Sequence, residues 1–123
     1  MTKEQIVNVA ARWWGTKILA GRAYSTSMTA CRLGMFEYRL AQTLAEEYEH
    51  CLEGRDPRSA FYIGCEEDAC PELITAAKAA DIDIAELPRY AKMHIRKNSV
   101  EVCVGRDDVR NYRYKELDYS HYI

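Results

Sequence analysis

The chain has 123 residues and a formal net charge of −2, and 48% of its residues are hydrophobic. A single domain over residues 1–123 can bury a core of its own at this length, and the composition excludes a collagen-like or disordered chain. The sequence pI of about 5.9 argues against general binding to duplex DNA.

No targeting or membrane segment is evident. The N-terminal residues MTKEQIVNVAARWW lack the basic region and the following apolar region of a signal peptide. No apolar run approaches the roughly 20 residues that span a bilayer. We therefore expect a cytoplasmic protein without a membrane segment.

The five cysteines fit reduced thiols, because an odd number without a signal peptide does not suit a disulfide framework. Cys65 and Cys70 are five positions apart, whereas common zinc sites pair cysteines more closely. We expect buried thiols there, and neither a metal nor another cofactor.

The first predicted elements are two helices. Thr2 and Gln5 have the form of a capping box, which predicts a helix from Lys3 to about Gly21. Residues 22–34 are predicted to form a long loop, a kind of segment that often carries function. A second helix is predicted over 34–52, and its apolar stripe consists of Phe36, Leu40, Leu44 and Tyr48.

In the second half of the chain, the sequence predicts a strand over 59–65, a helix over 70–82 and then a hairpin. From Tyr90 onward apolar residues recur at every second position, which is typical of strands. Lys97-Asn98 is predicted to be the two-residue loop between two such strands, and Asn98 would tolerate positive φ there. A turn at 105–108 and a short strand through Tyr112 and Tyr114 follow. The predicted fold class is α+β, with about three helices packed on one face of a small, mainly antiparallel sheet.

Charge is unevenly distributed along the chain. Residues 41–88 contain twelve acidic and three basic residues, and residues 89–115 contain eight basic and three acidic residues. Tyrosines accompany the basic residues, and Arg and Tyr together suit phosphates and bases. The basic and aromatic set consists of Arg89, Tyr90, Arg96, Lys97, Arg106, Arg110, Tyr112, Arg113, Tyr114 and Lys115. A solvated basic rim explains this set equally well.

Two further features have alternative explanations. Trp13 and Trp14 point about 100° apart on a helix, so one tryptophan is expected in the core and the other at an interface; a stacking plate for a base is the second interpretation. His94 lies on the strand face opposite Met93 and Ile95 and is expected to be exposed rather than catalytic. The sequence contains no nucleophile elbow, phosphate loop, zinc-protease helix or dinucleotide fingerprint.

Several segments resemble small phage and prophage proteins. They are the Trp pair, MFEYRLAQTLAEE, YIGCEEDACPELITAAKAADI, LPRYAKMHI and NSVEVCVG, between about Asn8 and Gly105. The pattern is similar to the anti-Thoeris signal-sponge family, which sequesters cyclic ADP-ribose signals without cleaving them. The resemblance implies a homo-oligomer with a ligand site around Leu87, Asn98, Arg110 and Arg113. Leu87 replaces the family's aromatic residue, for which Tyr90 would substitute.

The favoured hypothesis is therefore a non-enzymatic module that binds a nucleotide-like signal. Its expected site residues are Leu87, Arg89, Tyr90, Asn98, Arg106, Arg110, Tyr112 and Arg113. One alternative is an anti-CRISPR or other protein–protein inhibitor that uses its acidic helical surface. The other is a small nucleotide-processing enzyme, against which the missing catalytic motifs argue.

Overall fold

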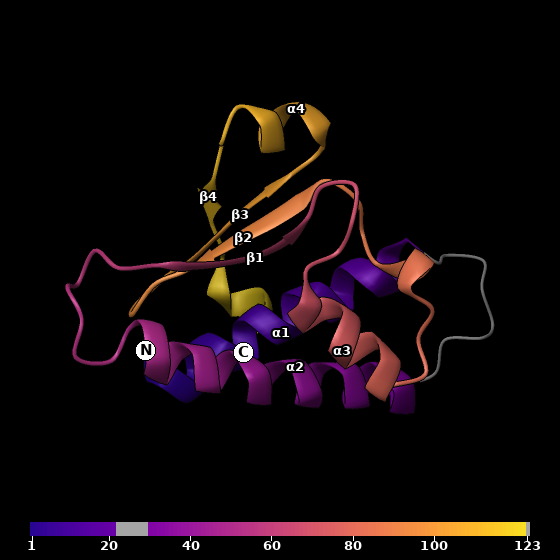
Figure 1. Ribbon diagram of the computed structural model, residues 1–123, viewed down its shortest axis with the longest axis horizontal. Coiled ribbons are helices and arrows are strands. Elements are labelled where there is room, and N and C mark those ends of the chain that lie inside the picture. The colour runs from indigo at the N-terminus through magenta and orange to yellow at the C-terminus, as the bar shows by residue number, and fades with distance from the viewer. Residues whose placement is uncertain (22–29, 123) are drawn as a thin grey trace.

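The computed structural model describes residues 1–21 and 30–122, and it has a helical layer on one face of a sheet (Figure 1). The helical layer consists of α1 (Lys3–Ala20), α2 (Ala30–Cys51) and α3 (Pro71–Ala79). The strands are β1 (Phe61–Cys65), β2 (Ala91–Ile95), β3 (Val100–Val104) and β4 (Lys115–Glu116). The predicted α+β class is confirmed. The predicted loop after α1 lies largely outside the described residues.

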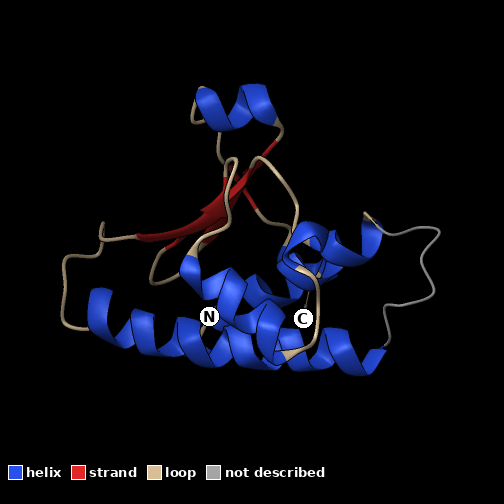
Figure 2. Cartoon of the chain, turned by 45° about the vertical axis from the view of Figure 1, so that its right-hand side comes forward, coloured by secondary structure: helices blue, strands red, loops and turns tan. Residues whose placement is uncertain are grey.

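Three short helices complete the fold. They are α4 (Arg106–Arg110) and two 3-10 turns, η1 (Ile84–Glu86) and η2 (Tyr119–His121). Helix α4 lies beyond the sheet from the helical layer (Figure 2). The sequence predicted a turn at this position, and five residues are too few for an apolar period to reveal a helix.

The sheet is antiparallel throughout and has the order β1-β2-β3-β4. Ile95 pairs with Val100, and the Arg96 N–H donates to the Ser99 carbonyl at 2.9 Å. The predicted two-residue loop at Lys97-Asn98 is therefore confirmed. Asn98 does not adopt positive φ, a conformation found instead at Asp81, Tyr90 and Tyr112 among the described non-glycine residues.

The core lies between the sheet and the helices. Alternate strand residues face it: Phe61, Ile63 and Cys65 on β1, and Ala91, Met93 and Ile95 on β2. Helix α2 contributes the predicted stripe, although it begins four residues earlier than predicted. Within the described ranges, no helix has the length and apolar character needed to cross a membrane.

Helix α1 is buried over a wide arc, and both of its tryptophans are in the core. Trp13 is 2% exposed and Trp14 is fully buried, with their ring centroids 4.9 Å apart in an edge-on arrangement. The prediction that one tryptophan covers an interface, or forms a stacking plate, is wrong.

The N-terminus of α1 has the predicted capping box. The Gln5 N–H donates to the Thr2 hydroxyl at 3.2 Å, and the Thr2 N–H donates to Gln5 Oε1 at 2.9 Å. Lys3 forms an ion pair with Glu49 near the end of α2, so α1 and α2 run antiparallel. The two helices thereby form the walls of a surface groove described below.

Candidate functional site

Tyr90 anchors the end of the molecule that carries α4. Its backbone has φ of 52°, its N–H donates to the Glu66 carbonyl at 3.3 Å, and its carbonyl accepts from the Gly105 N–H at 2.8 Å. The Arg106 guanidinium lies 5.7 Å from the centre of the Tyr90 ring. Arg106 and Tyr90, both predicted site residues, therefore do meet.

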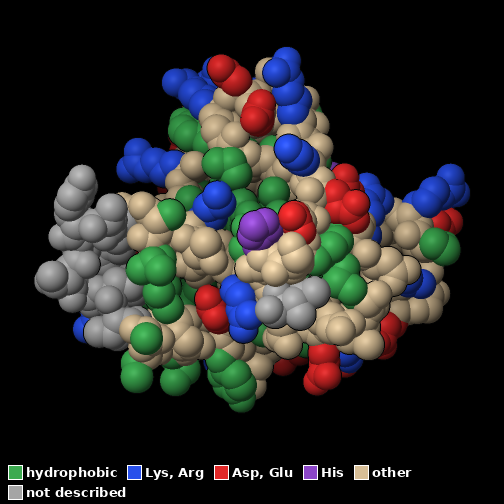
Figure 3. Space-filling model, turned by 180° about the vertical axis from the view of Figure 1, so that it is seen from behind, with side chains coloured by type: hydrophobic (Ala, Val, Ile, Leu, Met, Phe, Trp, Pro, Cys, Tyr) green, Lys and Arg blue, Asp and Glu red, His purple; other side chains and the backbone are tan. Residues whose placement is uncertain are grey.

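The hollow beside Tyr90 is lined by side chains of both charges. It has a volume of about 380 Å³ and brings Arg110 and Tyr90 together with the acidic loop Glu66, Glu67 and Asp68. Glu66 forms an ion pair with Lys92, and the Arg106 guanidinium lies over the Tyr90 ring, so acidic and basic side chains are mixed around the hollow. Acidic side chains also lie among the Lys and Arg side chains around α4 (Figure 3). Folding therefore mixes the charges that the sequence separates.

The remaining predicted site residues do not converge on this hollow. Leu87 is buried, and it lines a smaller hollow together with Arg89 and the acidic residues Glu67 and Asp68. Asn98 is at the tip of the β2–β3 hairpin, at the opposite end of the strands from Tyr90. Tyr112 and Arg113 are exposed, and Lys92 lies 5.4 Å from the centre of the Tyr112 ring. A ligand-binding role for these residues remains a prediction.

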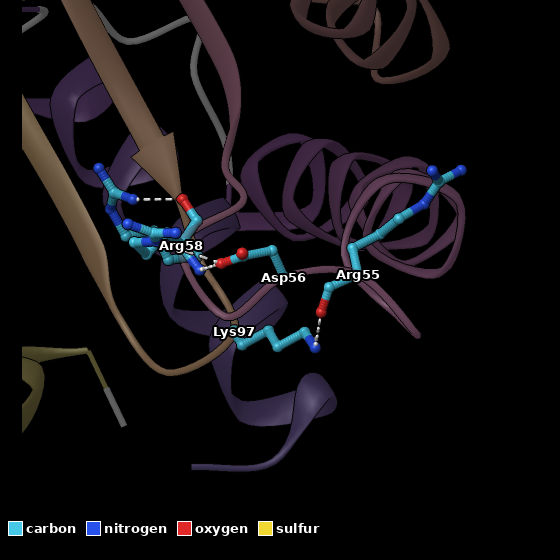
Figure 4. A network of polar contacts seen from close by, with 5 residues as sticks. Arg55, Asp56, Arg58 and Lys97 are labelled. Carbon is cyan, nitrogen blue, oxygen red and sulfur yellow. Dashed lines mark hydrogen bonds and ion pairs between the residues drawn. The ribbon is translucent and has the colours of Figure 1, made fainter.

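Basic residues at the hairpin tip have a structural role (Figure 4). Lys97 Nζ donates to the Arg55 carbonyl at 2.7 Å, and Arg96 donates to the Arg58 carbonyl at 2.9 Å. The Tyr48 hydroxyl donates to the Lys97 carbonyl at 2.9 Å. These bonds attach the hairpin tip to the connection after α2, so Arg96 and Lys97 are not a free anion-binding pair.

The outer face of the sheet contains an aromatic cluster instead of an exposed histidine. The His94 ring is stacked on Tyr114 and contacts Tyr62 edge-on. Burial lowers the pKa of His94, outweighing the opposite effect of Glu101. His94 Nε2 is buried and has no hydrogen-bond partner among the described residues. The prediction of an exposed His94 is therefore wrong.

Burial keeps the Cys65 and Cys70 thiols protonated at neutral pH. Burial raises the pKa of Cys65 to about 12 and also raises the pKa of Cys70. All five cysteines are free within the described part of the chain. The described residues contain no group of three or more His, Cys, Asp or Glu side chains arranged to hold a metal ion.

A groove between α1 and α2 is the better candidate site, and no pattern in the sequence indicated it. Its volume is about 390 Å³. Hydrophobic side chains also reach the surface at the lower left of Figure 3, on the helical side of the molecule. From α1 the lining includes Gln5, Asn8 and Arg12, from α2 it includes Gly34, Glu37, Tyr38 and Ala41, and Tyr122 near the C-terminus also lines the groove.

Glu37 is the unusual side chain of this groove. It is part-buried, and desolvation raises its pKa even though the charge of Arg12 acts in the opposite direction. Arg12 donates to the Tyr122 carbonyl at 3.4 Å. Glu37 has no hydrogen bond or ion pair with any residue that the structure describes. The carboxylate is therefore a partly desolvated acceptor without a compensating donor.

Gly15 allows Glu37 to occupy this position. A Cβ at Gly15 would overlap the Glu37 carboxylate and lie 2.9 Å from its Cγ. Glu37 thus lies directly against the backbone of α1. Sequence reasoning missed this pair because Glu37 is one of several acidic residues on α2 and Gly15 has no turn or positive φ to mark it.

The chain has a BTG-like fold, an α+β class with about three main helices and a four-stranded antiparallel sheet. The structure is similar to that of a doubly substituted form of the C. elegans FOG-3 BTG/Tob domain, with a TM-score of 0.67 at 12% sequence identity. The match covers 95% of this chain and 93% of that one. Neither a family model nor a curated protein sequence matches this chain.

This likeness corrects the family and function expected from sequence. A BTG/Tob-like architecture over nearly the whole chain contradicts the anti-Thoeris resemblance, the phage anti-defence role and the cyclic ADP-ribose ligand. The predicted partner, a nucleotide-like signal, is contradicted as well. The resemblance failed because it depended on spacing and hydrophobic type, which many α+β chains share.

Proposed function

We propose that this chain is a non-catalytic module that binds another protein through the α1–α2 groove. The likeness to a BTG/Tob domain favours a protein partner over a nucleotide signal, and a protein partner was among the roles left open by the sequence. The observation that carries the proposal is the groove itself. It combines exposed apolar surface with a part-buried, unpaired Glu37, as expected of a surface that a partner completes.

The charge of the α4 end supports this choice of surface. The hollow beside Tyr90 contains the acidic loop as well as Arg110, and Glu66 of that loop is paired with Lys92. At the other end of the strands, Arg96 and Lys97 are engaged in holding the hairpin tip. The α1–α2 groove, by contrast, exposes Tyr38, which is 62% exposed. Exposed aromatic side chains beside a groove are typical anchors of protein interfaces. The cytoplasmic location remains a prediction from sequence.

Site-specific photo-crosslinking tests the proposal. We expect a benzoylphenylalanine in place of Tyr38 to crosslink to a partner protein in cells, because this position borders the groove. The same residue in place of Tyr62, which is equally exposed on the outer sheet face, should not give that product. Ala41→Arg, which places a long side chain in the groove, should abolish the crosslink. A product that persists in the Ala41→Arg variant would contradict the proposal.

A further inference from the structure

We infer that the free edge of β1 binds an extended segment of a partner protein, which adds to the four-stranded sheet as one more strand. This edge is a second binding surface, separate from the α1–α2 groove, and the inference does not depend on the proposed function. It is carried by the direction of the backbone groups of β1, by their exposure and by the sequence of the strand.

The pairing of the sheet determines which way the backbone of β1 points. The Arg96 N–H donates to the Ser99 carbonyl, so the backbone groups of Arg96 face β3. Those of the preceding residue, Ile95, therefore face β1, where Ile95 pairs with Phe61. Because backbone groups alternate in direction along an antiparallel strand, the N–H and C=O of Tyr62 point away from β2.

A second contact agrees with this direction. Gly64, two positions beyond Tyr62, has the same orientation, and its carbonyl accepts from the Cys70 N–H at 3.0 Å. The loop after β1 thus covers the edge at Gly64. The N–H and C=O of Tyr62 have no hydrogen bond within the part of the chain that the structure describes. Since buried backbone groups are nearly always paired, these two groups face solvent, in agreement with the 62% exposure of Tyr62.

The β1 edge lacks the features that natural sheets use to prevent pairing. Free edges are commonly protected by a charged side chain, by proline or by a bulge. Strand β1 is FYIGC, which contains neither charge nor proline, and it pairs with β2 residue for residue over its whole length. The other edge strand, β4, has only two residues, and both of them, Lys115 and Glu116, are charged. The contrast indicates that β1 is the edge available for pairing.

The free groups define the occupant. An outward N–H and C=O on one strand residue match the backbone of another extended chain, whereas a helix has already paired its backbone groups internally. A hollow of about 410 Å³ beside Tyr62 is lined by acidic Glu66 and Asp68 and by basic Lys92, so backbone pairing rather than charge selects the partner. A β-branched or aromatic residue opposite Tyr62 would form a stabilising cross-strand pair with its ring.

Peptide binding by variants of Tyr62 tests this inference. Unstructured peptides are selected on the wild-type chain from a random display library, and fluorescence anisotropy gives Kd for each synthetic peptide. Tyr62→Pro removes the outward N–H but no bond to β2, and it should weaken edge binding roughly tenfold relative to Tyr62→Ala. Tyr62→Ala is the matched control, because it loses the same ring and keeps the N–H. Thermal melting verifies that both variants are folded.

Changes in the peptide give the same information with the protein unaltered. N-methylation of single peptide amides should weaken binding at alternate positions, because every second N–H of an added strand faces β1. In the free wild-type chain the Tyr62 amide should exchange with deuterium faster than the amides of Phe61 and Ile63, and the peptide should slow that exchange. An N-methylation pattern without a period of two, or a Tyr62 amide already protected in the free chain, would overturn the inference.

The outcomes for the edge and the groove are separable. Peptides that lose binding to Tyr62→Pro but retain it with Ala41→Arg would support the β1 edge. Peptides with the opposite response occupy the α1–α2 groove and support the proposed function alone. A selection that yields no peptide sensitive to Tyr62→Pro would contradict this inference and leave the proposed function intact.

Discussion

His94 is stacked on Tyr114, with their ring centroids 3.7 Å apart and their planes within 20°. Tyr62 contacts the same imidazole edge-on at a centroid distance of 4.1 Å. The histidine is thus held between two phenol rings on the outer face of the sheet. A protonated imidazole would fit this environment poorly, since its Nε2 is buried without a hydrogen-bond partner among the described residues.

We predict that His94 makes stability depend on pH. Burial lowers its pKa in the folded state below the ordinary value of 6.5, and Arg96 and Lys92 act in the same direction while Glu101 opposes them. The unfolded chain then binds more protons as the pH falls below about 6.5, so stability is present above that pH and decreases below it. Because the ring is only part-buried, solvent screening reduces this effect.

Chemical denaturation between pH 5 and pH 8 measures this effect. His94→Phe retains an aromatic ring but removes the titrating group, so its unfolding free energy should vary less with pH than that of wild type. His50→Asn, at an exposed position of α2, is the control and should retain the wild-type profile. Equal slopes for wild type and His94→Phe would rule out this role of His94.

Gly64 and Gly34 should respond in opposite directions to the same substitution. A Cβ at Gly64 would lie 2.8 Å from the Ala91 carbonyl oxygen and 3.1 Å from Lys92 Cα, both of which are backbone atoms of the paired strand. We expect Gly64→Ala to cost about 1–3 kcal/mol through strain between β1 and β2. At Gly34 a new methyl group would have no atom within 4 Å, so Gly34→Ala should gain about 0.5–1 kcal/mol from helix propensity. Urea denaturation of the two variants measures both values, and a stable Gly64→Ala would contradict the strand pairing.

The capping box of α1 should make a measurable contribution to stability. Thr2→Ala removes the hydroxyl that accepts from the Gln5 N–H, and we expect a loss of about 1 kcal/mol in unfolding free energy. Thr43→Ala removes a hydroxyl that only donates to the Arg39 carbonyl within α2. That control should be close to neutral, because alanine favours the helix interior. A loss at Thr43 as large as that at Thr2 would mean that the cap has no special role.

Trp14 should tolerate one substitution much better than another. Its ring is fully buried, whereas its Nε1 has no hydrogen-bond partner among the described residues. Trp14→Ala should cost about 3–5 kcal/mol because it leaves a large cavity. Trp14→Phe should cost far less, since it removes the unsatisfied N–H together with part of the ring. Thermal and chemical denaturation would show this order, and equal losses would indicate that the indole N–H is satisfied.

Much of the fold could be predicted because each sequence pattern that indicates a helix or strand lies within that element. The capping box, the α2 stripe and the change of period at Tyr90 each lie within one element and predicted that element correctly. The single-domain organisation over residues 1–123 remains a prediction. The short β4 strand at Lys115–Glu116 lies just beyond the strand predicted through Tyr112 and Tyr114, because two paired residues leave almost no pattern.

The candidate site could not be predicted in the same way. The groove is lined by residues of α1, α2 and the C-terminal segment, and the contact of Gly15 with Glu37 joins two positions that no periodicity links. The charge segregation along the chain was misleading because folding pairs Lys92 with Glu66 and places the acidic loop beside α4. Proximity in space, rather than along the sequence, determines whether a basic segment can attract an anion.

The order of the sheet has a consequence for the kinetics of folding. Each strand pairs with the strand that follows it in the sequence, from β1 to β4, so the sheet can form by successive closure of loops without threading. The longest of these closures joins β1 to β2 across α3, and the tight β2–β3 hairpin requires the shortest. Because loop-closure entropy grows with loop length, we expect the hairpin to form first and β1 to join it once α3 has formed. Destabilising the hairpin tip should therefore slow refolding, whereas a change at the β1 edge should mainly accelerate unfolding.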